Sequence, residues 1–389
     1  MTSTATDGQP PVRASSAVAA TLAAMTYIAG SPEDFLAVRH LTLRGTQAEI
    51  GHALAAEMKA RSGWSPPPID PIVARARRVW FARNWPQYAE RAAGFAEAYG
   101  LPVDAAVSFD DASALPAGSG CSAVWNGGTL GRNYDFFTLS WTQLGAVMAG
   151  ADPVDDATVP MASRPYVLTT IPDDGIASTS LSMSTVDGAM EGVNEAGLVV
   201  ALLMADIEAA APLEHDPGPQ AGLSVPQVCR YLLDTCENVD EAKEALMLAK
   251  QYDHGAPCHY IVADASGRGF VYERGAYDVE YFVEVADGPL CVTNHPLHRH
   301  PDIDALPEDT PGTFLTYRRL RTLTKEADTG PRDALDAVSV AIEPGAPWRT
   351  LWRSVFDPAA RTMSTRFYLG DGENGAARHS PELTFGVSR

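Results

Sequence analysis

The sequence predicts an α+β fold in which stacked β-sheets are covered by helices. Two observations lead to this prediction. Helical periodicity dominates the first 100 residues, whereas short β-rich runs begin after Cys121, give way to helical segments and then return. A chain of 389 residues, 46% of them hydrophobic, can also bury a large core, about three-quarters of the surface exposed by the unfolded chain.

The N-terminal part divides into an arm and a helical segment. Residues 1–32 are expected to form a flexible arm, because the chain begins with Ser, Thr, Pro and Gly and has little to bury there. Thr46 and Glu49 form a capping box, which predicts a helix from that point. A second amphipathic helix is expected to end at Gly100. Residues 33–120 are therefore expected to be mainly helical.

Beyond this segment, runs rich in β-branched and aromatic residues predict strands, most of them bounded by Gly, Asp or Pro. The predicted strands are 121–126, 129–136, 165–171, 197–204, 258–264, 269–274, 278–284 and 289–293. Helices are predicted over 225–236, 239–250, 313–327 and 331–341. Segments 351–357 and 362–369 flank a four-residue turn and predict a terminal hairpin.

One predicted hairpin gathers reactive side chains. If Gly127–Gly128 is a two-residue turn, Cys121 lies opposite Tyr134, and Arg132 and Asp135 come close to the thiol. A register slip of one residue would change which side chains face the thiol but not their proximity. A guanidinium favours the thiolate form of a cysteine, and a carboxylate can hold an amine or orient the arginine.

Other interpretations stay open from the residues alone. Cys121 could be a small buried hydrophobe, and the chain a non-catalytic binding protein. Cys121 and His259 have the separation of a papain-like pair, although the flank of the cysteine differs from that family's motif. A histidine-rich loop could bind a metal, but we expect a solvated loop without metal, because zinc hydrolase spacings are missing. That loop contains His295, His298, His300 and Asp302.

Charge and cysteine usage exclude several partners. The net charge of −20 opposes binding to nucleic acid or to an anionic membrane surface. No apolar run reaches the ~18 residues of a spanning helix. Five irregularly spaced cysteines do not form a disulfide framework, so a reducing, cytoplasmic location is expected. Nucleotide-binding and dinucleotide-binding motifs are missing, and no cofactor is expected.

Several segments, in the same order, resemble the choloylglycine hydrolase and acyl-CoA:6-aminopenicillanic acid acyltransferase superfamily of N-terminal-nucleophile hydrolases. The resemblance spans roughly residues 36 to 370 and is nearest to the acyltransferase branch, which has a long propeptide. The segments are Arg44–Gly51, Gly120–Ser122 with Gly131–Phe136, Gly192–Leu198, Val292–Pro296, Thr316–Leu320 and the closing hairpin.

The resemblance implies a four-layer αββα sandwich and an enzyme activated by self-cleavage between Gly120 and Cys121. Residues 33–120 would be the propeptide, and 121–389 the catalytic chain with Cys121 at its N-terminus. The freed α-amine would act as base for the thiol, and an acyl-Cys121 thioester would form during cleavage or synthesis of a linear amide. The two chains would stay associated, because released helices would expose apolar faces.

The resemblance also assigns roles to individual residues. Asp135 would hold the α-amine, and Arg132 would steady the thiolate or the substrate. The backbone N–H of Asn194 and the side-chain amide of Asn294 would form the oxyanion hole. Arg318 would brace the aspartate or the cysteine, with Arg319 and Arg321 on the same helix left as alternatives.

Aromatic residues near the cysteine suggest an apolar pocket for an acyl group, although core packing is the commoner role for such residues. They are Trp125, Tyr134, Phe136 and Phe137. The expected partner is a small-molecule amide or acyl donor, with acyl-CoA as one option, and a homo-oligomer is compatible with the sequence. Whether water or an amine accepts the acyl group stays open.

Overall fold

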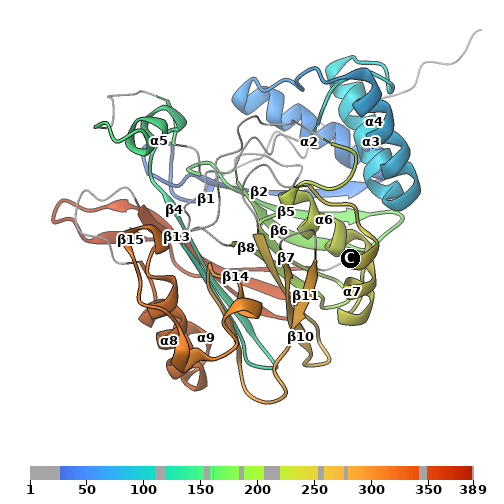
Figure 1. Cartoon of the computed structure of the whole chain (residues 1–389). Coiled ribbons are helices and arrows are strands. Elements are labelled where there is room, and N and C mark those ends of the chain that lie inside the picture. The colour runs from blue at the N-terminus through green and yellow to red at the C-terminus, as the bar shows by residue number, and fades with distance from the viewer. Residues whose placement is uncertain are drawn as a thin grey trace, which may run out of the picture.

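The computed structural model describes residues 27–109, 120–152, 158–160, 162–183, 188–205, 220–252, 258–275, 279–340 and 348–387. Two β-sheets pack face to face, and helices cover the outer face of each sheet (Figure 1). Most of the predicted arm, residues 1–26, lies outside the described residues. Tyr27–Ala29 already pair with the next strand, so regular structure begins earlier than predicted.

The first sheet contains nine strands within the described residues, in the order β1-β2-β5-β6-β7-β8-β9-β10-β11. They are β1 (Tyr27–Ala29), β2 (Val38–Gly45), β5 (Tyr166–Pro172), β6 (Ser178–Ser182), β7 (Glu191–Asn194), β8 (Val199–Met204), β9 (Cys258–Ala263), β10 (Gly269–Arg274) and β11 (Glu280–Val283). The strands are antiparallel except for β2 and β5, which run parallel. A parallel pair needs a crossover connection, and helices between these two strands supply it.

The second sheet has the order β12-β3-β4-β13-β14-β15, with β16 also paired to β14. Its strands are β3 (Cys121–Trp125), β4 (Leu130–Phe137), β12 (Leu290–Val292), β13 (Trp348–Asp357), β14 (Thr362–Asp371), β15 (Ala377–His379) and β16 (Leu383–Gly386). Cys121 pairs with Tyr134 and Ala123 with Arg132, so the predicted hairpin register is confirmed. The predicted terminal hairpin is confirmed as β13 and β14.

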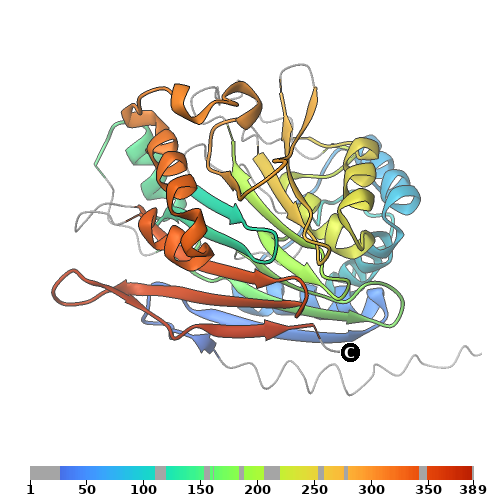
Figure 2. The same ribbon diagram turned by 90° about the horizontal axis from the view of Figure 1, so that it is seen from below.

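Two pairs of helices complete a four-layer αββα sandwich, as predicted. Helices α6 (Val225–Thr235) and α7 (Val239–Leu248) pack on the first sheet. Helices α8 (Thr316–Glu326) and α9 (Pro331–Ala337) pack on the second. Figure 2 shows the strands between these two pairs. Another helix, α5 (Trp141–Met148), follows β4. No helix in the described part of the chain is long and apolar enough to span a membrane.

The N-terminal segment is less purely helical than predicted. Its helices are α2 (Gln47–Ser62), α3 (Pro71–Asn84) and α4 (Pro86–Tyr99). The capping box at Thr46 and the end at Gly100 are confirmed. However, β2 joins the first sheet, and α3 was not predicted although Asp70 caps it and a proline occupies its first position. This segment therefore belongs to the body of the sandwich.

Buried side chains fasten these helices to the rest of the molecule. Arg91 of α4 donates to Gln47 Oε1 (2.7 Å) and forms an ion pair with Asp234 of α6 (3.0 Å). Trp85 Nε1 donates to the same aspartate at 3.2 Å. A core cluster beneath α2 also joins Leu54 of that helix to residues of β2 and β5. Separating the helices from the sheets would expose both the charges and the apolar surface.

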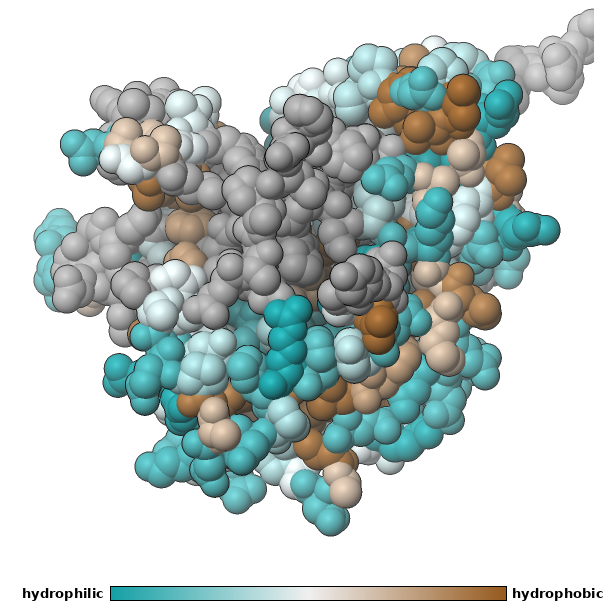
Figure 3. All heavy atoms as spheres, viewed as in Figure 1, coloured by the Kyte–Doolittle hydropathy of each residue, from teal (hydrophilic) through white to brown (hydrophobic). Residues whose placement is uncertain are grey.

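The molecular surface shows a group of apolar side chains over the region of α3 and α4 (Figure 3). Ile72 and Val79 of α3 and the nearby Val103 are exposed. An apolar groove of about 220 Å³ lies between these helices and residues 103–109. Elsewhere on this face, the described residues mix polar and apolar side chains, as is usual for a folded domain.

The close contact of α2 and α4 yields a stability prediction. A Cβ on Gly94 would lie 1.9 Å from Ala48 O, so Gly94→Ala should push the helices apart and lower the free energy of unfolding, by about 1–3 kcal/mol. Gly145 of α5 is the matched control, because a Cβ there meets nothing within 4 Å. Gly145→Ala should leave stability unchanged or slightly raised in urea denaturation. Equal effects of the two substitutions would contradict the close-packing argument.

Candidate active site

Cys121 opens strand β3 and faces the first sheet. Its side chain is buried, and its Sγ lies 3.6 Å from Nη2 of Arg132 on the neighbouring strand. The backbone of Asp135 also hydrogen-bonds to the thiol. The hairpin thus brings together the cysteine, the arginine and the aspartate that were singled out from the sequence.

Arg132 has a partner that the sequence did not reveal. Its Nη1 forms an ion pair with Glu191 of β7, and both side chains are fully buried. Nη2 donates to the carbonyl of Leu202 on β8 at 2.5 Å. Glu191 also accepts from Trp352 Nε1 at 3.1 Å. Glu191 lies outside every strand predicted from the sequence, so no sequence pattern pointed to it as this partner.

The environment does not favour the thiolate, contrary to the expectation from Arg132 alone. Burial raises the pKa of the Cys121 thiol, and the nearby Asp135 raises it further, while Arg132 and Arg319 oppose this shift. Desolvation of the sulfur is the largest effect, and it outweighs the opposing attraction of Arg132. The thiol therefore needs a base before it can attack.

The backbone nitrogen of Cys121 is held as firmly as its sulfur. Its N–H donates to Asn294 Oδ1 at 2.8 Å. The same oxygen accepts from Arg319 Nη2 at 2.6 Å, and Asn294 Nδ2 donates to Met204 O at 2.9 Å. Asn294 is thus at the site, where its oxygen holds the cysteine nitrogen and one hydrogen of its Nδ2 group bonds to the end of β8, so its role as an oxyanion donor stays a prediction.

Arg319, rather than the expected Arg318, reaches the site. Its Nη1 donates to the carbonyl of Cys121 at 2.6 Å and to Ser122 Oγ at 2.9 Å. Arg318 is exposed, because neighbouring residues of a helix point about 100° apart and Arg319 takes the inward direction. Arg321 donates to the carbonyl of Leu306. Sequence periodicity could not fix which arginine points inward, because the helix begins after two residues with positive φ.

Those two residues are Phe314 and Leu315, with φ values of 51° and 58°. The left-handed conformation is costly for residues other than glycine. The tight turn aims α8 at the cysteine, and Arg319 Nε closes it by donating to Phe314 O at 3.1 Å. The strained turn therefore sets the orientation of the arginine.

Asp135 has one carboxylate oxygen to spare. Its Oδ1 accepts from Thr350 Oγ1, whereas its buried Oδ2 has no hydrogen-bond partner among the described residues. Burial raises the pKa of this carboxyl to about 6, although Arg319, Thr350 and Arg132 favour the charged form. A buried acceptor without a donor commonly marks a place where another group binds.

The expected oxyanion donor Asn194 lies elsewhere. Its N–H donates to Leu198 O at 3.0 Å in the turn between β7 and β8, and its side chain donates to the carbonyl of Cys236 at 2.7 Å. The opposite end of β8 reaches the cysteine. There the carbonyl of Leu202 accepts from Arg132, and the carbonyl of Met204 accepts from Asn294. Asn194 is therefore a turn residue, and the Gly192–Leu198 segment contains the turn that joins β7 to β8.

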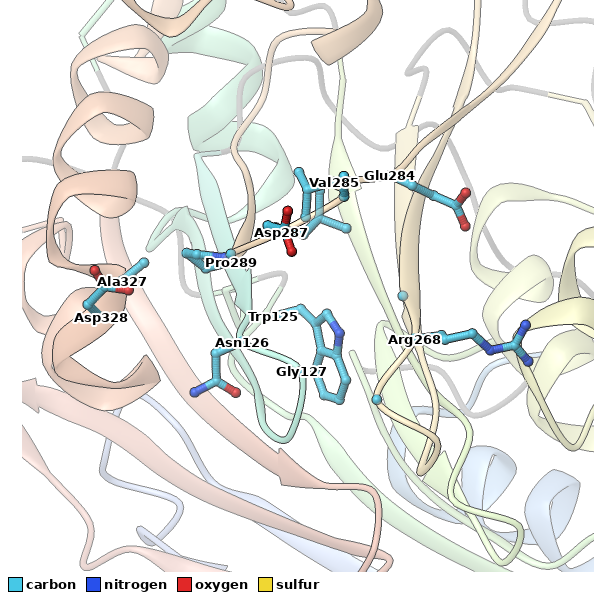
Figure 4. A pocket seen from close by; sticks show the side chains of 15 residues that line it. Trp125, Asn126, Gly127, Arg268, Glu284, Val285, Asp287, Pro289, Ala327 and Asp328 are labelled. Atoms are coloured by element: carbon cyan, nitrogen blue, oxygen red, sulfur yellow. The ribbon is translucent and has the colours of Figure 1, made fainter.

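The four aromatic residues near the cysteine do not form one pocket. Tyr134 stacks on Trp352 with ring centroids 3.9 Å apart, and Phe136 is equally buried in the core. Phe137 lies at the end of β4 near Phe314. Trp125 is at the far end of β3, where it lines a separate open cavity of about 730 Å³ with polar walls (Figure 4). Of the four, only Phe137 is linked through ring contacts with Phe314 and Trp348 to the position of Gly120.

The papain-like pair and the metal loop are not assembled among the described residues. His259 faces Glu273 (Nδ1 to Oε1, 2.9 Å) rather than the thiol, and His298 binds the other oxygen of that glutamate at 2.7 Å. His295 contacts Thr316, and burial lowers its pKa to about 3. In the described part of the chain, no three His, Cys, Asp or Glu side chains are arranged to hold a metal ion.

Comparison with known proteins adds an independent observation. Residues 125–309, just under half of the chain, match the family model of acyl-coenzyme A:6-aminopenicillanic acid acyl-transferase. No curated protein matches the sequence significantly. The matched segment includes Arg132, Asp135 and Asn294 and begins four residues after Cys121.

Among solved structures, penicillin V acylase from Agrobacterium tumefaciens is 18% identical and has a TM-score of 0.42, with 64% of this chain and 82% of that chain covered. A variant of conjugated bile acid hydrolase from Clostridium perfringens is 14% identical with a TM-score of 0.43, covering 69% and 98%. The Caenorhabditis elegans ortholog of N-acylethanolamine-hydrolyzing acid amidase is 13% identical with a TM-score of 0.39, covering 62% and 93%. These scores are too low to support an argument about the function of this chain.

The unpaired carboxylate oxygen yields a pH prediction. The pKa of Asp135 is raised from 3.8 to about 6 in the fold, so its stabilising contribution is complete below 3.8 and is lost as pH rises through 6. The loss is about 3 kcal/mol at ~1.4 kcal/mol per pKa unit. We expect the unfolding free energy of Cys121→Ala to fall between pH 4 and 7, and the fall to be smaller in Cys121→Ala/Asp135→Asn. Parallel pH profiles would contradict the prediction.

Proposed function

We propose, on the premise that the chain belongs through residues 125–309 to the acyl-coenzyme A:6-aminopenicillanic acid acyl-transferase family, that it is a cysteine amidohydrolase or acyltransferase activated by cleavage between Gly120 and Cys121. One observation carries the proposal. Asn294 and Arg319 together hold the backbone nitrogen of Cys121. Such a buried network is costly to build around an ordinary peptide nitrogen, but it suits a nitrogen that becomes a catalytic base.

Activation would begin with attack of the Cys121 thiol on the carbonyl of Gly120. The C–N bond breaks as the acyl group moves to sulfur, and the nitrogen takes up the proton that the thiol gives up, so that it becomes the α-amine. Water then hydrolyses the thioester, which leaves a carboxylate on Gly120 and a free thiol on Cys121. The net change is hydrolysis of one peptide bond, which requires no group beyond this chain and water.

In the mature enzyme the α-amine would take the thiol proton. An α-amine has a pKa near 7.7–8, so at neutral pH it can serve as the base that a buried thiol of raised pKa requires. The free Oδ2 of Asp135 would accept from the resulting ammonium, and Arg132, 3.6 Å from the sulfur, would support the thiolate. The positive ammonium would thus lie beside Asp135, and the negative thiolate beside Arg132.

Turnover would transfer an acyl group through Cys121. The thiolate attacks the carbonyl of a small-molecule amide or acyl donor, a C–S bond forms, and the leaving amine carries away the proton held by the α-amine. Water or a second amine then takes the acyl group from sulfur. Both acyl-CoA and a simple amide are donors of this class. The N-terminal helices would remain bound after cleavage, because buried residues such as Arg91 join them to α6.

The proposal is tested by acylation of the thiol. Purified protein is incubated with an octanoyl thioester of N-acetylcysteamine, and the octanoyl adduct on the fragment that begins at Cys121 is measured by mass spectrometry. Arg319→Lys should slow self-cleavage and acylation by about 100-fold, because lysine cannot replace the forked contacts to Cys121 O and Asn294 Oδ1. The adduct should be lost in Cys121→Ser.

Arg318→Lys is the matched control, because Arg318 is the exposed neighbour on the same helix. It should retain the rates of the unmodified chain, with an unchanged melting temperature. A wild-type protein that gains no octanoyl group on Cys121, or equal losses in the two arginine variants, would contradict the proposed function.

A further inference from the structure

The residue before the nucleophile has no room for a side chain. A Cβ added to Gly120 would lie 2.2 Å from Cζ2 and 2.8 Å from Cη2 of Trp348. Contacts this short are overlaps, so either the backbone at residue 120 or the indole would have to move. The six-membered ring of Trp348 therefore closes one side of the scissile position.

The indole is held in place by its neighbours. Trp348 begins β13 and pairs with Phe137 of β4. Its ring meets that of Phe314 edge to face, with centroids 4.8 Å apart, and Phe314 in turn contacts Phe137 at 6.3 Å. Phe314 lies in the strained turn before α8. Three rings fixed by a strand pair and a turn form a rigid wall.

The same indole carries an unused donor. Trp348 Nε1 is buried and has no hydrogen-bond partner among the described residues. Buried indole N–H groups usually have an acceptor. The Nε1 atom is bonded to Cε2, which would lie 3.3 Å from a Cβ on Gly120. The Nε1–H group of Trp348 therefore lies near the edge of the indole that faces the scissile position. An oxygen atom of a bound acyl compound could accept a hydrogen bond from it there.

We propose that Trp348 determines acyl specificity, and that the enzyme rejects acyl groups whose carbon next to the carbonyl carries a branch in the direction of an L side chain. This inference rests on the proposed function. In self-cleavage and in turnover the same sulfur attacks a carbonyl carbon, so the substrate carbonyl takes the place of the Gly120 carbonyl. The adjacent carbon then occupies the position of Gly120 Cα, where Trp348 blocks a substituent in the direction of an L side chain.

The class of substrate follows from this geometry. A straight-chain acyl group, or an aryl group joined through a CH₂, places only hydrogen against the indole. An L-aminoacyl group with a side chain, or a 2-methyl acyl group of the same sense, places a carbon there. The acylation step itself is unchanged: the C–S bond forms, the bond to the leaving amine or thiol breaks, and the leaving group takes the proton.

The first test uses self-cleavage, which needs no added substrate. Gly120→Ala should slow cleavage between residues 120 and 121 by about 100-fold, and Gly120→Ala/Trp348→Leu should recover most of that loss, because leucine removes the ring that the methyl meets. Gly128→Ala, in the turn of the same hairpin where a Cβ meets nothing within 4 Å, should cleave at the wild-type rate. Rapid cleavage of Gly120→Ala, or no recovery in the folded double variant, would overturn the inference.

The second test needs only the wild-type enzyme. The two enantiomers of the 2-methyloctanoyl thioester have equal intrinsic reactivity, so a difference between them reports the pocket. The enantiomer whose methyl points toward the position of an L side chain, the R form, should acylate Cys121 at least ~50-fold more slowly than octanoyl thioester. In Trp348→Leu this discrimination should fall about tenfold.

The outcomes separate the inference from the function on which it rests. Rapid octanoyl transfer with equal rates for the R enantiomer and the straight chain would overturn the role of Trp348 and leave the proposed function intact. A wild-type chain that neither cleaves nor accepts octanoyl would overturn both.

Discussion

A buried ion pair between the two sheets determines where the chemistry takes place. Arg132 of β4 and Glu191 of β7 are both fully buried, and charges without water are tolerated only when they are paired. The pair fixes the two sheets against each other and leaves Arg132 Nη2 3.6 Å from the sulfur of Cys121. Burial of the sulfur raises the pKa of the thiol, although Arg132 opposes this shift. A thiol with a raised pKa needs a nearby base to remove its proton. The backbone nitrogen of Cys121 itself, held by Asn294, is close enough to become that base once it is a free amine.

The site is arranged around a peptide bond as well as around a thiol. Arg319 contacts the carbonyl of Cys121, and through Asn294 it fixes the nitrogen that would be freed by cleavage. Asp135 keeps one oxygen without a donor among the described residues. On the other side of the bond, Trp348 leaves space for glycine alone. In the proposed function, each of these features would serve both self-cleavage and acyl transfer, because the two reactions would share one nucleophile and one carbonyl position.

Local patterns predicted the parts of this structure that depend on local physics. The register that places Cys121 opposite Tyr134 follows from a two-glycine turn, and the capping box at Thr46 follows from two residues. Arg318 was mistaken for Arg319 because a strained turn sets the phase of α8. The positions of Asn194 and Glu191 relative to the cysteine depend on which end of β8 meets the second sheet. That contact joins residues far apart in the sequence, so no hydrophobic periodicity in the sequence predicts it. The unpredicted strand β6 is rich in serine and threonine, so its sequence lacks the apolar run of a buried strand.

The central claim is that Cys121 becomes an N-terminal nucleophile, and the mass of the denatured protein tests it most directly. The full chain has a mass of 41.5 kDa. The account predicts two fragments that meet at Gly120 and Cys121 in the wild-type protein and one intact chain in Cys121→Ala. An intact chain in both, after prolonged incubation of the folded protein at neutral pH, would contradict it.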